Sequence, residues 1–161
     1  MSLRIYFEGD IKLRSGFRTF FEKHIKGMGK FDVIAGKGKP IKAFLNGVNS
    51  HPEDFCILLM DADVFKSSEY CKAVHQRNDW ILRKGQTIED EQLNFMVQLM
   101  ESWFYAEKDV LSDFYGRGFQ KGKLKRTQNI EKITKQDVED GLKAATVKST
   151  KGEYHKTMHA P

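Results

Sequence analysis

Hydrophobic positions in the first half of the chain follow two periods in turn, one typical of strands and one typical of helices. Short apolar segments rich in β-branched and aromatic residues predict strands over 3–7, 31–36 and 55–60. Between them, apolar residues recur every three or four positions, from 17 to 28 and from 41 to 48, which predicts two amphipathic helices. Strands that alternate with helices in this way are typical of an α/β protein with a parallel sheet.

The pattern after the third strand predicts further elements. A helix is expected over 67–78, followed by a polar loop. Residues 93–100 fit a fourth strand, although a helical interpretation stays open because the segment continues smoothly into a helical pattern over 101–116. A segment rich in glycine and basic residues, 116–128, predicts a mobile loop with little to bury.

The last helix has a clear start signal. Thr134 with Asp137 three residues later has the spacing of a capping box, and an apolar stripe follows it. We therefore predict an α/β, Rossmann-like fold with a mainly parallel sheet of about four strands, flanked by helices and followed by a helical, basic C-terminal part. In this prediction residues 1–115 form the α/β core, and residues 116–161 are a basic loop and helical extension of the same domain.

Composition narrows the class of protein. The chain has 161 residues, of which 40% are hydrophobic and 30% charged, as in an ordinary globular domain. The longest uninterrupted apolar segment is residues 55–60, far short of a membrane span, and the N-terminus becomes charged too early for a signal peptide. Cys56 and Cys71 fit neither a disulfide framework nor a metal-ligand spacing. A cytoplasmic, reduced protein is expected.

The positive charge is concentrated near the C-terminus. Up to Gly116 there are 16 basic and 17 acidic residues, whereas from Arg117 onward there are 11 basic and 5 acidic ones. This excess fits either a solvated surface or an arm that faces phosphate groups. The residues predicted to contact nucleic acid are Arg117, Lys121, Lys123, Lys125 and Arg126. Phe119 would either stack on a base or fold back onto the core.

Acidic residues follow the predicted strands. Glu8 comes after the first strand, Asp61 and Asp63 after the third, and Glu101 after the fourth. Ligands of parallel α/β sheets bind beyond the carboxyl ends of the strands, so these side chains are expected to converge there. Clustered carboxylates need a counter-charge, and oxygen ligands without histidine or cysteine favour Mg²⁺ or Mn²⁺. The alternatives are that Glu8 caps the first helix and that Glu101 is a favoured N-terminal helix residue.

Five segments in order, YFEGD, LLMDADVF, MVQLMESWF, NIEKITK and KGEYHK, resemble the bacterial family called domain of unknown function 4276. That family is assigned a Toprim-like fold, the catalytic module of topoisomerases and primases. The resemblance covers nearly the whole chain. It departs from the family in two places: no further glutamate follows Glu8 until Glu22, and relatives usually continue well past the last of these motifs.

The resemblance implies an Mg²⁺-dependent nuclease or related phosphodiester-processing enzyme that acts on DNA or RNA. Glu8 would be a general acid/base or a metal ligand, Asp61 and Asp63 would hold the metal, and Glu101 would be an added acidic member. The residues that match the later motifs would lie near the scissile phosphate: Lys135, Tyr154, His155 and Lys156. A lysine there would stabilise developing negative charge, and His155 would protonate a leaving oxygen.

Relatives often lie beside an ATPase gene in loci for defence against phage, so an ATPase partner is also expected. Two other functions remain open at this point. One is a regulatory or adaptor protein of an ATPase complex that binds metal without turnover. The other is a small nucleotide-sugar transferase, because the D-x-D after the third strand also resembles the metal-binding motif of those enzymes.

Overall fold

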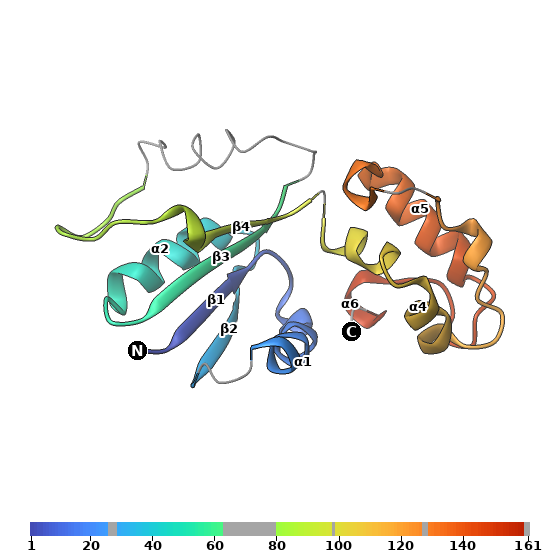
Figure 1. The fold of residues 1–161 in the computed structure, drawn as a ribbon, viewed down its shortest axis with the longest axis horizontal. Coiled ribbons are helices and arrows are strands. Elements are labelled where there is room, and N and C mark those ends of the chain that lie inside the picture. The colour runs from blue at the N-terminus through green and yellow to red at the C-terminus, as the bar shows by residue number, and fades with distance from the viewer. Residues whose placement is uncertain (26–28, 63–79, 98, 127–128, 160–161) are drawn as a thin grey trace. The chain divides into compact units, whose positions relative to one another are not determined.

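The computed structural model describes residues 1–25, 29–62, 80–97, 99–126 and 129–159. Its first part is a four-stranded parallel sheet with the strand order β2-β1-β3-β4 (Figure 1). The strands span Leu3–Phe7 (β1), Phe31–Ala35 (β2), Phe55–Asp61 (β3) and Leu93–Met96 (β4). The predicted α/β fold is confirmed, whereas the helix predicted over 67–78, together with Cys71, lies outside the described residues.

The two helices between the first three strands cover opposite faces of the sheet. Phe7 of β1 packs against Phe17 of α1 (Arg14–His24), with ring centroids 4.6 Å apart. Tyr6, the residue before Phe7 in β1, packs against Phe44 of α2 (Pro40–Ser50), with ring centroids 6.1 Å apart. Successive residues of a strand point to opposite faces, so β1 is buried on both sides, which is why its segment is apolar throughout.

The register of the central strands shows that β3 extends beyond the end of β1. Ile5 of β1 pairs with Val33 of β2 on one side and with Ile57 of β3 on the other. Phe7, the last residue of β1, pairs with Leu59, so β3 continues two residues further, to Asp61. The fourth strand ends at Met96, and the chain then forms the 3-10 helix η3 (Met100–Tyr105). Both interpretations of 93–100 were therefore partly right.

In its described residues, the C-terminal part of the chain has three α-helices and a hydrophobic core of its own. They are α4 (Lys108–Tyr115), which ends at Gly116 with a positive φ of 71°, α5 (Lys135–Thr146) and the short α6 (Lys156–His159). Thr134 caps α5 by accepting the N–H of Asp137, as predicted. The core joins residues from Leu99 to Tyr154 and includes Tyr115, Leu124, Ile133, Val138 and Leu142.

Two apolar side chains between residues 116 and 126 are packed against the core, although the composition of this segment predicted little to bury. Leu124 is only 1% exposed, and Phe119 packs against the same core, with its ring stacked on Tyr115 at 5.7 Å. A 3-10 turn, η4 (Lys121–Lys123), precedes Leu124. Leu124 and Phe119 therefore attach this segment to the core, although charged and glycine residues surround them.

The chain packs as two compact units, Met1–Met60 with Lys66–Phe95 and Asp61–Phe65 with Met96–Ala160. The sequence predicts a boundary after residue 115, between the α/β core and an extension of the same domain. Residues 96–115 nevertheless contribute Leu99, Tyr105 and Tyr115 to the core that α5 completes. In the part of the chain that the structure describes, no helix combines the length and the apolar character that a membrane crossing requires.

Candidate functional site

Asp61, the last residue of β3, is held by main-chain contacts at the start of the second unit. The N–H of the following residue, Ala62, donates to the carbonyl oxygen of Met96 at 3.0 Å. The Asp61 Oδ1 accepts the N–H of Met100, also at 3.0 Å, and its side chain is 11% exposed. The carboxylate thus satisfies a main-chain donor at the start of η3, which has no partner within that helix.

Glu101 lies in the first turn of η3 and is almost completely buried, with 1% of its surface exposed. Its Oε1 accepts a hydrogen bond of 2.9 Å from the Tyr154 hydroxyl. Its Oε2 is buried and has no hydrogen-bond partner among the described residues. A buried carboxylate oxygen without a partner is costly, because water no longer solvates its charge.

Lys156 brings Asp61 and Glu101 together. Its Nζ lies 3.2 Å from Glu101 Oε1 and 3.7 Å from Asp61 Oδ2. The two carboxylates are largely buried, whereas the lysine side chain is 44% exposed. One ammonium group therefore faces two carboxylates.

Tyr154 is fixed by its main chain as well as by its hydroxyl. Its N–H donates to Thr146 Oγ1 at 2.6 Å, and that hydroxyl donates to the carbonyl oxygen of Leu142 in α5. Burial, followed by the neighbouring Glu101 carboxylate, raises the pKa of Tyr154 well above its usual value. Tyr154 therefore keeps its proton and remains a hydrogen-bond donor to Glu101.

The donor set of this group suits a hard divalent cation. Asp61 and Glu101 offer carboxylate oxygens, and Glu101 Oε2 is a buried acceptor that still lacks a donor or a cation. Asp61 and Glu101 would present oxygen ligands to a cation, which favours Mg²⁺ or Mn²⁺ over Zn²⁺. The residues therefore fit the cation that the sequence predicts.

The other predicted acidic residues are placed differently. Glu8 follows β1 in the first unit, where its N–H donates to the Leu59 carbonyl oxygen at 2.9 Å. The side chain that caps the following helical turn belongs to Asp10, which accepts the N–H of Lys12. This capping role was considered for Glu8 but belongs to Asp10, two residues further along the chain. Asp63 lies outside the described residues.

The two remaining predicted catalytic residues are exposed. Lys135 is the first residue of α5, and His155 lies between the buried Tyr154 and Lys156. Lys156 is the predicted site residue whose ammonium group lies near both Asp61 and Glu101. The roles of Lys135 and His155 stay predictions from the sequence.

The predicted nucleic-acid residues divide into two sets. Lys121 pairs with Asp109, and Lys125 pairs with Asp137 at 2.7 Å. Arg117, Lys123 and Arg126 are exposed and form no ion pair among the described residues. Phe119 packs on the core, which is the alternative that the sequence left open.

Positive charge is dense beside this segment. Lys108 donates from its Nζ to the carbonyl oxygen of Lys125 at 2.9 Å. Burial lowers the pKa of Lys108, and the nearby charges of Arg126 and Lys121 lower it further. A lysine that is destabilised by neighbouring cations gains from a nearby anion, because the anion offsets that repulsion.

Two features of the first unit were not expected from the sequence. Side-chain atoms of His51, Glu53 and Asp54 lie within 4.8 Å of one another. Arg4, however, pairs with Asp54 at 2.8 Å and lowers its pKa, and Ser2 also donates to Asp54. This carboxylate is thus already bound to donors of the protein.

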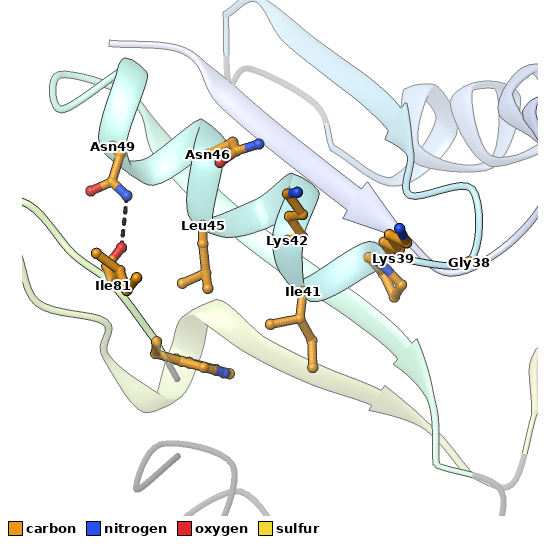
Figure 2. Close-up of a pocket in the computed structure, with 10 residues that line it drawn as sticks. Gly38, Lys39, Ile41, Lys42, Leu45, Asn46, Asn49 and Ile81 are labelled. Carbon is orange, nitrogen blue, oxygen red and sulfur yellow. Dashed lines mark hydrogen bonds between the residues drawn. The ribbon is translucent and has the colours of Figure 1, made fainter. Parts of the chain in front are cut away.

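The second feature is a pocket of about 500 Å³ along α2 (Figure 2). Its apolar side is formed by Ile41, Leu45 and Trp80, and its polar rim by lysine and asparagine side chains. Asn49 donates to the carbonyl oxygen of Ile81 at 2.9 Å and so holds residue 81 beside the helix. Nothing in the sequence pattern indicated this pocket, because the polar segment 79–92 was expected to be only a loop.

Comparison of the chain with models of protein families, with curated proteins and with solved structures found no match. The resemblance of its motifs to the family of domain of unknown function 4276 therefore stays a prediction from the sequence.

Asp61 and Glu101 were predicted from the sequence, but their contacts with Tyr154 and Lys156 were not. Glu101 was expected because it follows the fourth strand, yet its hydrogen bond to Tyr154 spans 53 residues. Tyr154 was considered either a site residue or a packing residue; it packs in the core of the second unit, and its hydroxyl donates to Glu101. The signal that was available is the apolar context of Glu101 in LMESWF, since a charge in such a context needs a partner.

Proposed function

We propose that this chain is a divalent-metal-dependent enzyme that cleaves or otherwise processes phosphodiester bonds of nucleic acid. The observation that carries the proposal is the Glu101 carboxylate, which is 1% exposed and keeps one buried oxygen without a hydrogen-bond partner among the described residues. Asp61 shares Lys156 with it. The motif resemblance supports the same reaction class, and so does the basic C-terminal third.

In this proposal Asp61 and Glu101 hold the cation, and the roles of Glu8 and Asp63 as further ligands stay predictions from the sequence. A bound Mg²⁺ or Mn²⁺ would neutralise phosphate charge and lower the pKa of a bound water.

Side chains of the protein orient the carboxylate, stabilise negative charge and donate a proton. Tyr154 donates its proton to Glu101 Oε1 and so fixes the orientation of the carboxylate. Lys156, with 44% of its side chain exposed, reaches solvent and can donate to a non-bridging phosphate oxygen, where it stabilises developing negative charge. His155 is the exposed neighbour that can give a proton to a leaving oxygen.

The test separates metal binding from turnover. Thermal unfolding of the full chain is measured with increasing Mn²⁺ or Mg²⁺, because a ligand that binds only the folded state raises the midpoint. We expect a rise for the natural chain and none for Glu101→Gln, which keeps the size of the side chain. Cleavage of labelled single- and double-stranded DNA and RNA is then followed with the same cations.

A matched control is Glu131→Gln, which removes an exposed acidic residue of the same unit and should leave both results unchanged. Cleavage that is equal in Glu101→Gln, Asp61→Asn and the natural chain would remove these residues from the site. A midpoint that rises with cation, together with no cleavage of any substrate, would favour the adaptor function beside an ATPase.

A further inference from the structure

Two segments far apart in the sequence meet on one surface of the second unit. The N–H of Thr150 donates to the carbonyl oxygen of Arg117 at 2.9 Å, and its hydroxyl donates to the same oxygen at 3.2 Å. Gly118, with a φ of 88°, lies so close to Lys148 that an added Cβ would be 1.9 Å from the Lys148 carbonyl oxygen. The turn after α4 is thereby fixed against the turn after α5.

Three basic residues lie in or beside these two turns. Arg117, Lys148 and Lys151 are all exposed, and none forms an ion pair with any acidic residue that the structure describes. Asp113 and Glu153 flank the surface in the sequence but do not pair with these three side chains. By contrast, Lys121 and Lys125 in the predicted basic segment are both neutralised by aspartates.

One of these cations, Lys151, lies over an exposed aromatic ring. Phe114, near the end of α4, is 38% exposed, and the Lys151 Nζ lies 4.4 Å from its ring centroid. A surface that combines unpaired cations with an accessible ring matches the two chemical parts of a single strand, its phosphates and its unstacked bases. A duplex offers phosphates alone at such a surface, because its bases are stacked on one another.

We propose that Phe114, Arg117, Lys148 and Lys151 form a binding surface for single-stranded nucleic acid. This surface rests on the proposed function for its role, since it would deliver a strand to the same unit that holds Asp61 and Glu101. The cations contact the phosphates, and the ring stacks on a base when Lys151 moves to a phosphate. The strand is therefore bound here rather than at Phe119, whose ring is stacked on Tyr115.

The experiment measures binding without metal, so that it does not depend on cleavage. Fluorescence anisotropy of a labelled single-stranded oligonucleotide, in EDTA and at several salt concentrations, gives Kd for the full chain. In the triple variant Arg117→Gln/Lys148→Gln/Lys151→Gln we expect Kd to rise by about tenfold or more. The slope of log K against log salt should fall by about 2, because each phosphate contact on a single strand contributes about 0.7.

The matched control removes the same charge from the first unit. Lys37→Gln/Lys42→Gln/Lys84→Gln changes three exposed lysines that likewise form no ion pair among the described residues, and it should leave most of the affinity intact. Equal weakening by the two triple variants would overturn the proposal, because binding would then follow net charge alone.

Phe114→Ala tests the ring separately. We expect it to weaken single-strand binding by about fivefold or more and duplex binding much less, since stacking requires an unpaired base. An equal effect on single-strand and duplex binding would overturn the role of the ring.

Binding to anionic vesicles with no binding to oligonucleotides would overturn the whole proposal in favour of a membrane surface. Loss of cleavage in Glu101→Gln with this binding intact separates the two proposals.

Discussion

At the scale of single residues, the informative feature is a buried carboxylate that is only partly satisfied. Glu101 accepts hydrogen bonds or ion-pair contacts at Oε1 from Tyr154 and Lys156, whereas its Oε2 has no partner among the described residues. Structures retain such groups at a cost, which points to a role in binding. The protein limits the cost by fixing Tyr154, the neutral donor, in the core.

Replacing the donor should reveal that cost. Tyr154→Phe leaves the ring in place but removes the hydroxyl from a charged, buried acceptor, so we expect the free energy of unfolding to fall by about 1–3 kcal/mol. Urea unfolding measures it. The control is Tyr105→Phe, whose hydroxyl donates to the neutral carbonyl oxygens of Asp137 and Val138. A loss no larger than in this control would mean that the Glu101 carboxylate does not depend on Tyr154.

At the scale of elements, two helices approach tyrosines through glycines. A Cβ added to Gly47 of α2 would lie 1.9 Å from the Tyr6 hydroxyl oxygen, and one added to Gly141 of α5 would lie 2.1 Å from that of Tyr105. Glycine within a helix normally lowers stability relative to alanine. Here its missing side chain makes room for a tyrosine, so the packing decides the residue.

This packing gives a prediction that reverses the usual helix preference. Gly47→Ala should lower the free energy of unfolding by about 1–3 kcal/mol, because the added methyl group overpacks the contact between α2 and β1. Thermal or urea unfolding is the measurement. Adding Tyr6→Phe to the variant should restore part of the loss.

Gly122→Ala is the matched control, since no heavy atom lies within 4 Å of its added Cβ. A Gly47→Ala chain as stable as the natural one, or more stable, would contradict this account of the packing.

At the scale of the whole molecule, both units bury groups that ionise at alkaline pH. Burial raises the pKa of the Cys56 thiol from 9.0 to about 11, and it raises the pKa of three tyrosines from 10.0 to about 12: Tyr6, Tyr105 and Tyr115. In the unfolded chain these groups lose their protons at their ordinary pKa. The folded state therefore holds more protons than the unfolded state between these values.

The sign of the pH dependence follows from this difference. The contribution of these groups to stability is complete below about pH 9 and is lost as the pH rises through their folded pKa values. We expect the free energy of unfolding to fall steadily from about pH 9 to about pH 12, measured by urea unfolding at each pH. In Cys56→Ala the fall should begin nearer pH 10, where the unfolded tyrosines start to ionise. A stability that is flat over this range would contradict the burial of these groups.

Much of the fold could be predicted because local patterns carry it. The segments 3–7, 31–36 and 55–60 were expected as strands from short apolar runs, and they form β1, β2 and β3 within one residue. The start of α5 was predicted from Thr134 and Asp137, since a capping side chain bonds to a main-chain N–H only three residues away. Such interactions lie within a few residues of the chain and so can be seen in it.

What the sequence by itself determined is therefore the α/β class, its main elements and the identity of Asp61 and Glu101 as candidate acidic residues. Only the tertiary structure decided that Lys156 joins these two carboxylates, that Tyr154 fixes one of them, and that Lys148 and Lys151 lie beside Arg117. These contacts join residues about 30 to 95 positions apart. Their geometry depends on how helices pack around a shared core, and a local pattern of hydrophobic and polar residues contains no information on that packing.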